Sequence, residues 1–166
     1  MSVSAHRSSA PAGVPCFVLT VSDTRTLDTD KSGSAIVEML SLAGHSVVDR
    51  RMVKDDAAAV SDAVRARLSG PARAIITTGG TGIASRDMTY EAINAMFDKR
   101  LDGFGELFRS LSYAQIGSAA MLSRACAGIA KGKVIFVLPG SEAAVRLAME
   151  RLVIPELGHI VGELSK

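Results

Sequence analysis

Apolar runs and amphipathic segments alternate along this chain from residue 16 to its end. Apolar runs predict buried strands at residues 16–22, 74–78 and 134–138, and residues 46–53 are predicted as a further strand. Apolar positions spaced three and four apart predict helices at residues 34–43, 57–68, 89–97, 105–111 and 141–152, and a last helix from Glu156, after Pro155. This alternation is typical of an α/β three-layer sandwich, in which a mainly parallel sheet has helices on both faces.

One part of the pattern departs from strict alternation. Residues 121–129 and 134–138 are two apolar segments that flank the short polar sequence Lys131-Gly132-Lys133. Two strands joined by so few residues must run antiparallel, because a parallel connection needs a long crossover. The sequence therefore predicts one antiparallel strand in the sheet.

Glycines follow the third predicted strand. The segment Thr78-Gly79-Gly80-Thr81-Gly82 is followed by Arg86 and Asp87. Glycines let consecutive backbone N–H groups face an anion, and an arginine adds a second phosphate-binding group. An acid beside a phosphate is typical of a metal site. The alternative is a tight turn with Asp87 or Thr89 as the cap of the next helix.

The other predicted parallel strands also end in polar residues. They are followed by Ser22-Asp23, by Asp55-Asp56 and by Pro139-Gly140-Ser141. Each has a local explanation: Asp23 in a turn, Asp55 or Asp56 as a helix cap, and Ser141 at a helix start. Because ligands bind at the carboxyl ends of strands in open α/β sheets, the four groups together predict a site for a phosphorylated ligand with Mg²⁺.

Composition narrows the class of protein. At 166 residues and 48% hydrophobic, the chain predicts one domain over residues 16–166, after a flexible arm at residues 1–15. A net charge of +2 and 4% aromatic residues argue against nucleic-acid binding. No apolar run reaches the roughly 20 residues of a membrane span. Cys16 and Cys126 lie in apolar segments and predict buried free thiols in a reducing cytoplasm. Neither a dinucleotide-binding nor a Walker fingerprint is present.

A cluster of large apolar residues predicts assembly. It comprises Met96-Phe97, Phe104, Leu107-Phe108 and Leu111. Surplus apolar surface is typical of a subunit interface, although the same residues could instead close the core over one sheet edge.

Several ordered motifs together resemble the MoaB/Mog family of molybdenum cofactor biosynthesis, and its MoaB branch in particular. They are Val21-Ser22-Asp23, Thr77 to Gly82 with Arg86-Asp87-Met88-Thr89-Tyr90-Glu91-Ala92, Gly103-Phe104-Gly105-Glu106, Leu122-Ser123-Arg124 and Leu138-Pro139-Gly140-Ser141. The sequence departs from the family pattern at Lys54, Tyr90 and Glu142, where the family often has proline or asparagine-proline.

The resemblance implies a molybdopterin-binding domain that transfers AMP from ATP to the terminal phosphate of molybdopterin with Mg²⁺. It places the catalytic and metal-binding acids on Asp55 and Asp87. With the glycine loop, the expected substrate-binding residues are Ser22, Asp23, Thr78, Gly79, Gly80, Thr81, Gly82, Arg86, Pro139, Gly140 and Ser141. It also implies a homotrimer or a hexamer, and other molybdenum cofactor biosynthesis proteins as partners. Two alternatives remain: a non-catalytic molybdopterin-binding or scaffold protein, and a generic phosphosugar or nucleotide enzyme.

Overall fold

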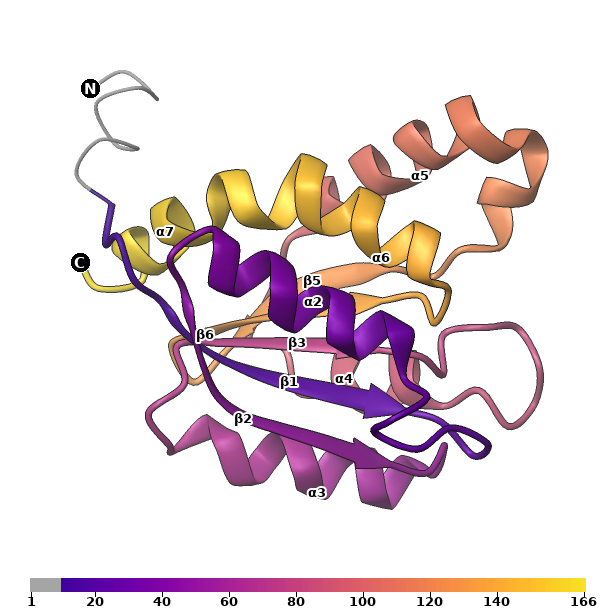
Figure 1. Ribbon diagram of the computed structural model, residues 1–166, viewed down its shortest axis with the longest axis horizontal. Coiled ribbons are helices and arrows are strands. Elements are labelled where there is room, and N and C mark those ends of the chain that lie inside the picture. The colour runs from indigo at the N-terminus through magenta and orange to yellow at the C-terminus, as the bar shows by residue number, and fades with distance from the viewer. Residues whose placement is uncertain (1–9) are drawn as a thin grey trace.

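A single sheet forms the centre of the molecule. The computed structural model describes residues 10–166 (Figure 1). The sheet order is β2-β1-β3-β6-β5-β4. The strands are β1 (Pro15–Val21), β2 (Ser46–Val53), β3 (Ala74–Thr78), β4 (Lys99–Arg100), β5 (Cys126–Ala130) and β6 (Lys133–Leu138). Strands β2, β1, β3 and β6 are parallel, and β5 runs antiparallel to both β6 and β4. The predicted mainly parallel sheet with one antiparallel strand is confirmed.

Helices cover both faces of this sheet (Figure 1). On one face lie α2 (Lys31–Leu42), α5 (Asp102–Ile116), α6 (Glu142–Ala148) and α7 (Ile154–Glu163). On the other face lie α3 (Ala57–Leu68) and α4 (Thr89–Asn94). A 3-10 helix, η1 (Gly117–Leu122), follows α5, and a π-helix, η2 (Met149–Val153), joins α6 to α7. The structure is therefore the three-layer sandwich that the alternation predicts.

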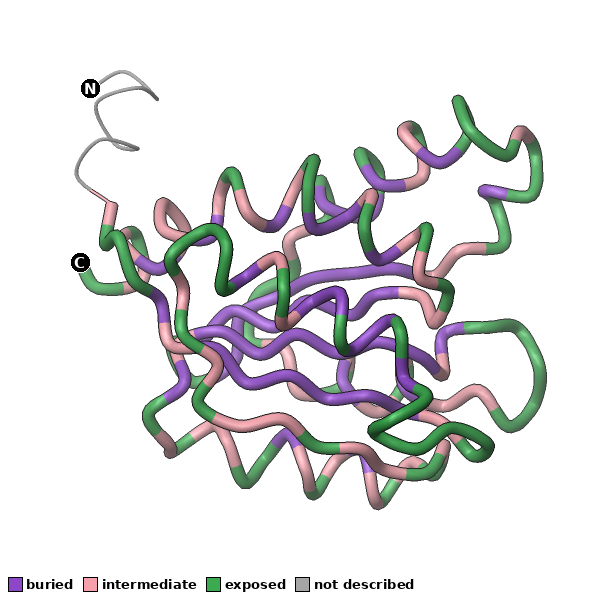
Figure 2. The backbone as a smooth tube through the Cα atoms, viewed as in Figure 1, coloured by how far each residue is buried: buried purple, intermediate pink, exposed green. Residues whose placement is uncertain are grey.

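The central strands β1, β3 and β6 are almost entirely buried because both of their faces are covered. In β1, Phe17 and Leu19 pack in the cluster beneath α3 and α4, whereas Cys16 and Val18 pack beneath α2 and the C-terminal helices. Figure 2 shows the resulting buried layer through the middle of the molecule. Burial raises the pKa of the Cys16 thiol to about 12 and that of Cys126 to about 11. Both cysteines are free and buried, as predicted.

The sequence predictions for two segments were wrong in extent. Residues 121–129 do not form one strand, because η1 ends at Leu122 and β5 begins only at Cys126. Met121 and Leu122 are apolar but are 74% and 53% exposed, so their hydrophobicity does not mark a buried strand. The helix predicted at residues 105–111 is α5, which extends over 15 residues from Asp102 to Ile116.

The amino-terminal part of the predicted arm lies outside the described residues. Val14, near the end of the predicted arm, is fully buried, and its carbonyl oxygen accepts a hydrogen bond from the N–H of Ser46 at 3.1 Å. Pro15 is the first residue of β1. The last two residues of the predicted arm, Val14 and Pro15, therefore belong to the folded domain. Within residues 10–166, no helix is long and apolar enough to cross a membrane.

Candidate functional site

The polar ends of the four parallel strands meet at one edge of the sheet. The N–H of Gly79, after β3, donates to the carbonyl oxygen of Leu138 at the end of β6. The N–H of Ser22, after β1, donates to the carbonyl oxygen of Val53 at the end of β2. The predicted residues 22–23, 55, 78–82, 86–87 and 139–141 follow these strand ends. Parallel strand order therefore brings them to one rim.

The glycine loop after β3 requires glycine at two positions. Gly79 has φ +99° and Gly80 has φ +68°, a backbone conformation that other residues rarely adopt. A Cβ on Gly79 would overlap the carbonyl oxygen of Val21, and a Cβ on Gly80 would overlap Thr89 Oγ1. The loop consequently runs tightly between β1 and the start of α4.

Carboxylates crowd together beside this loop. The backbone N–H of Asp55 donates to Asp23 Oδ1 at 3.2 Å, and the N–H of Met88 donates to Asp55 Oδ1 at 3.4 Å. Arg86 forms an ion pair with Asp23. Burial raises the pKa of Asp55, and the nearby carboxylates of Asp87 and Asp23 raise it further, whereas the Met88 hydrogen bond opposes the rise. Asp55 thus lies among carboxylates that disfavour its own negative charge, and a cation bound there would relieve that repulsion.

Neither acid in the proposed metal pair caps a helix. The N-cap of α4 is Met88, which makes no side-chain capping bond, so the alternative that Asp87 or Thr89 caps this helix is wrong. Asp87 Oδ2 instead accepts the N–H of Ala84 at 3.1 Å within the loop. Asp56, not Asp55, caps α3 by accepting the N–H of Ala59 at 2.8 Å.

These groups suit a magnesium ion. Mg²⁺ binds carboxylate oxygens and commonly takes only one or two of them from the protein, with substrate phosphates completing its shell. Thr89 Oγ1 is buried beside Gly80 and has no hydrogen-bond partner among residues 10–166. No group of three or more His, Cys, Asp or Glu side chains in that part of the chain forms a metal-binding cluster on its own. A metal held by Asp55 and Asp87 would therefore depend on ligand oxygens.

Some predicted binding residues have side chains engaged in local structure. Ser22 Oγ accepts the N–H groups of Thr24 and Arg25, at 3.3 and 3.1 Å. Thr78 Oγ1 donates to the carbonyl oxygen of Pro139 at 2.7 Å. Ser141 is the N-cap of α6, which confirms the local interpretation of this residue. These residues shape the rim, and their backbone groups remain the candidates for ligand contact.

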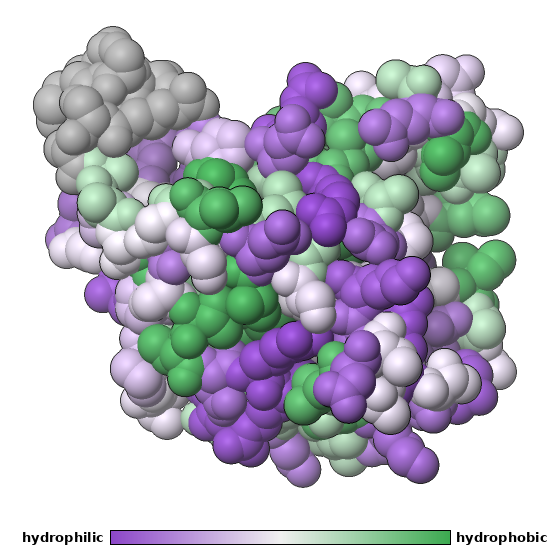
Figure 3. Space-filling model, viewed as in Figure 1, coloured by the Kyte–Doolittle hydropathy of each residue, from purple (hydrophilic) through white to green (hydrophobic). Residues whose placement is uncertain are grey.

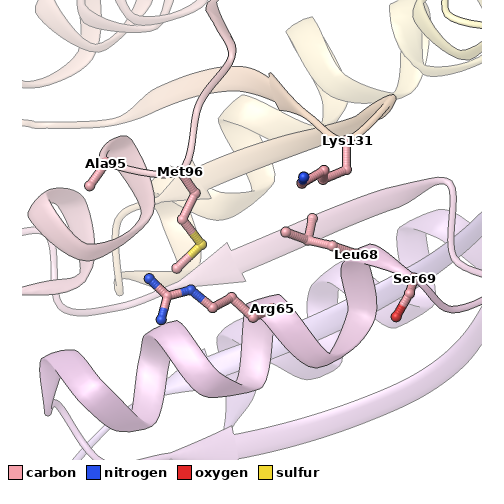
Figure 4. A pocket seen from close by; sticks show the side chains of 6 residues that line it. All are labelled: Arg65, Leu68, Ser69, Ala95, Met96 and Lys131. Carbon is pink, nitrogen blue, oxygen red and sulfur yellow. The ribbon is translucent and has the colours of Figure 1, made fainter.

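A hollow of about 330 Å³ adjoins the glycine loop. Thr81, Gly82 and residues 139–141 line one part of it, and residues of α5, η1 and α6, including Phe108 and Ile116, line the rest. Its volume lies within the range of small-molecule sites. A larger hollow of about 470 Å³ lies between α3, the end of α4 and the β5–β6 turn, where Arg65, Met96 and Lys131 line it (Figure 4). None of the predicted site residues lines this second hollow.

Sequence reasoning gave no role to two arginines at the rim. Arg25 Nη1 donates to the carbonyl oxygen of Gly140 at 3.1 Å. Arg124 Nε donates to the carbonyl oxygen of Thr81 at 3.1 Å and its Nη2 to that of Gly82 at 2.6 Å. Arg124 belongs to the Leu122-Ser123-Arg124 motif, which was the only signal of its importance.

Comparisons with known proteins agree with the geometry. The family described as probable molybdopterin binding domain matches residues 17–159. "Molybdenum cofactor biosynthesis protein B" of Halalkalibacterium halodurans is 51% identical over 168 residues, which is 100% of this chain and 99% of the relative. The protein of the same name from Bacillus subtilis is 50% identical over the same shares of the two chains.

Solved structures show the same fold. A crystal structure of a molybdenum cofactor biosynthesis protein B has a TM-score of 0.91 and 52% identity, covering 95% of this chain and 99% of that one. The tungsten cofactor synthesizing protein MoaB from Pyrococcus furiosus has a TM-score of 0.86 and 40% identity, covering 95% and 100%. This chain belongs to the molybdopterin-binding domain family of molybdenum cofactor biosynthesis proteins.

Proposed function

We propose that this protein transfers AMP from ATP to the terminal phosphate of molybdopterin, using Mg²⁺. The observation that carries the proposal is the position of Asp55 beside Asp87 and Asp23, next to the glycine loop. Crowded carboxylates at a phosphate-binding edge suit a divalent cation that two phosphorylated ligands share. The pterin ring would occupy the hollow between residues 139–141 and the apolar side chains of α5 and α6.

The chain supplies positioning and charge rather than a nucleophile. An oxygen of the pterin phosphate attacks the α-phosphorus of ATP, and the bond from that phosphorus to the β-bridging oxygen breaks, so pyrophosphate leaves. Asp55 and Asp87 would hold Mg²⁺, which neutralises charge on the reacting phosphates. Backbone N–H groups of the glycine loop and the guanidinium of Arg86 would hold a phosphate oxygen in line. Arg86 is 66% exposed in its side chain, which leaves it accessible to a ligand.

A non-catalytic molybdopterin-binding protein is the second candidate. It is favoured by the hollow beside the glycine loop, which could hold a pterin without any metal ion. Such a protein would bind molybdopterin in the same hollow and would leave ATP unchanged. The two candidates thus differ in turnover and share pterin binding.

One assay separates them. Purified protein is incubated with molybdopterin, Mg²⁺ and ATP labelled at the α-phosphate, and adenylylated pterin and pyrophosphate are measured. We expect label in the pterin with the wild type and none with Asp87→Asn, while Asp62→Asn, an exposed acid on α3, behaves as the wild type. Pterin binding without label transfer would support the non-catalytic candidate and refute the adenylyltransferase.

We also propose that the chain forms a homo-oligomer with threefold symmetry, a trimer or a hexamer. In the predicted apolar cluster, Phe104 and Phe108 are buried in the core, whereas Leu107 is 57% exposed. The exposed apolar surface follows α5 and η1, where Tyr113, Ile116 and Met121 are 65%, 60% and 74% exposed. Figure 3 shows hydrophobic atoms gathered at that end of the molecule. Surface of this kind is typical of a subunit interface.

A further inference from the structure

We propose that Arg124 is a positioning residue that holds the segment from Thr81 to Asp87 in the shape the site needs. The inference rests on the proposed function for its meaning in catalysis and on this chain's own contacts for its geometry. Arg124 lies two residues before β5. In the sequence it is 37 residues from Asp87, the end of the segment that it contacts.

A single guanidinium binds both ends of this segment. At the start of the segment it donates to the carbonyl oxygens of Thr81 and Gly82, at 3.1 and 2.6 Å. At the far end, Arg124 Nη2 donates to the carbonyl oxygen of Asp87 at 3.2 Å. The planar, rigid fork of arginine suits several acceptors at fixed angles, which the point charge of a lysine does not reproduce.

Holding these carbonyl groups also sets the direction of the N–H groups that follow. A trans peptide is planar, so its N–H points away from its C=O. With the carbonyl oxygen of Asp87 turned toward Arg124, the N–H of Met88 points to the other side, where it donates to Asp55 Oδ1. The same rule turns the N–H groups of Gly82 and Ile83 away from Arg124. The guanidinium therefore orients the donors of the loop without touching the ligand.

Residues 82–86 have little else to hold them. All five are exposed, and Ile83 is 71% exposed, so the buried side chain of Thr81 anchors only the start of the segment. Within residues 10–166, the other bonds of residues 82–86 are the short-range ones between Ala84 and Asp87 and the ion pair of Arg86 with Asp23. Because an ion pair this exposed contributes little to stability, Arg124 is the main long-range restraint on the segment.

Arg124 is itself held in place from α4. Its guanidinium pairs with the Glu91 carboxylate, and its Cζ lies 5.1 Å from the centre of the Tyr90 ring. The hydrogen bond from Arg124 lowers the pKa of Glu91, so this carboxylate stays ionised at neutral pH. Helix α4 begins at Thr89, directly after the segment. Tyr90 and Glu91 thus hold Arg124 over the same residues whose shape it determines.

The test compares Arg124→Gln and Arg124→Lys with Arg51→Gln, which removes an exposed arginine paired with Asp49 on β2. Amide hydrogen exchange of residues 82–88 is measured in the full chain without ligand. We expect exchange about tenfold faster or more in both Arg124 variants, with β1 and β3 unchanged and Arg51→Gln like the wild type. If residues 82–88 exchange as in the wild type in both Arg124 variants, the proposal is wrong.

Kinetics tests the link to the reaction. If loop shape positions Asp87, the kcat for adenylyl transfer should fall about 100-fold in Arg124→Gln, the scale expected for a displacement of about 1 Å. The Mg²⁺ concentration for half-maximal rate should rise, while the Kd for molybdopterin changes little. A residue with a merely structural role would lower the Tm and leave both kinetic values unchanged, and that result would overturn the positioning role.

A second variant guards against misfolding. Glu91→Gln keeps the Arg124 side chain and removes only the carboxylate charge that pairs with it. Faster exchange at residues 82–88 and a lower kcat should therefore both appear, in weaker form. If Arg124→Gln fails to fold, Glu91→Gln decides the matter by its exchange at residues 82–88. Should the wild type lack adenylyl transfer, the proposed function fails, but the exchange data still decide whether Arg124 holds the segment.

Discussion

Asp55 and Asp56 are adjacent in sequence, and the structure predicts opposite consequences when each is replaced. Asp56 Oδ2 caps α3, and loss of such a cap costs about 1 kcal/mol of folding free energy. For a domain of this size, about 1 kcal/mol lowers the Tm by about 2–4 °C. Asp56→Ala should therefore be less stable and remain active, because Asp56 faces the helix it caps.

Asp55→Asn should keep its stability and lose activity. The pKa of Asp55 is raised by burial and by its neighbouring carboxylates, so its ionised form destabilises the folded state at neutral pH. Asparagine removes this charge and keeps an oxygen for the N–H of Met88. Stability should equal or exceed that of the wild type, whereas the adenylyl transfer rate should fall about 100-fold or more, or about 3 kcal/mol, through loss of a metal ligand.

The assay is thermal unfolding across pH, paired with initial rates. The stability gain of Asp55→Asn should vanish below about pH 3.9, the ordinary Asp pKa, where the wild-type group is protonated in both states. It should grow as the pH rises through the raised pKa of the folded protein. A loss of stability in Asp55→Asn at neutral pH, or equal rate losses in Asp55→Asn and Asp56→Ala, would refute the reasoning.

Three further predictions concern the loop, the core and assembly. Gly80→Val should weaken molybdopterin binding in a titration, because any Cβ there overlaps Thr89 Oγ1 and φ is +68°; unchanged affinity in a folded variant would place the ligand elsewhere. Burial alone would raise the pKa of Asp30, but hydrogen bonds, including one from Arg50, lower it on balance. The ionised Asp30 carboxylate should therefore stabilise the folded state above about pH 3.9, and this stability should be lost as the pH falls toward the lowered pKa. Asp30→Asn should flatten that part of the acid unfolding curve. Light scattering at micromolar concentration should give a trimeric or hexameric mass, and a monomeric or dimeric mass would contradict the threefold assignment.

The predicted bounds of Ser46–Val53, Ala57–Leu68 and Ala74–Thr78 are those of β2, α3 and β3. In β3 this success has a plain physical reason, because all five residues are buried and its apolar run marks that burial. Prediction failed at a segment whose apolar side chains are exposed. Met121 and Leu122 are apolar and exposed, so they were assigned to a strand that begins only at Cys126.

Hydrophobic periodicity also could not predict a very short strand made of charged residues. Strand β4 is Lys99–Arg100, two exposed charged residues that join the sheet only through backbone pairing with β5. No periodicity exists in two residues, and nothing in their side chains predicts a strand. Backbone hydrogen bonding to a neighbour decides such an element, and a single sequence does not contain that information.

Part of the candidate site could be predicted from the sequence and part could not. Residues that follow parallel strands could be placed at one rim, because every such strand has its carboxyl end at that edge. Strand β5 is antiparallel, so its beginning, not its end, lies at the rim: Cys126 pairs with Val137 near the end of β6. The residue at the rim is consequently one that precedes β5, and Arg124 is such a residue.

The hairpin at Gly132 was predicted, and its direction already implied that the approach to β5 would reach the glycine loop. Reading only strand ends missed this arginine, and in a sheet of mixed direction the residues that enter each antiparallel strand belong among the candidates for the site.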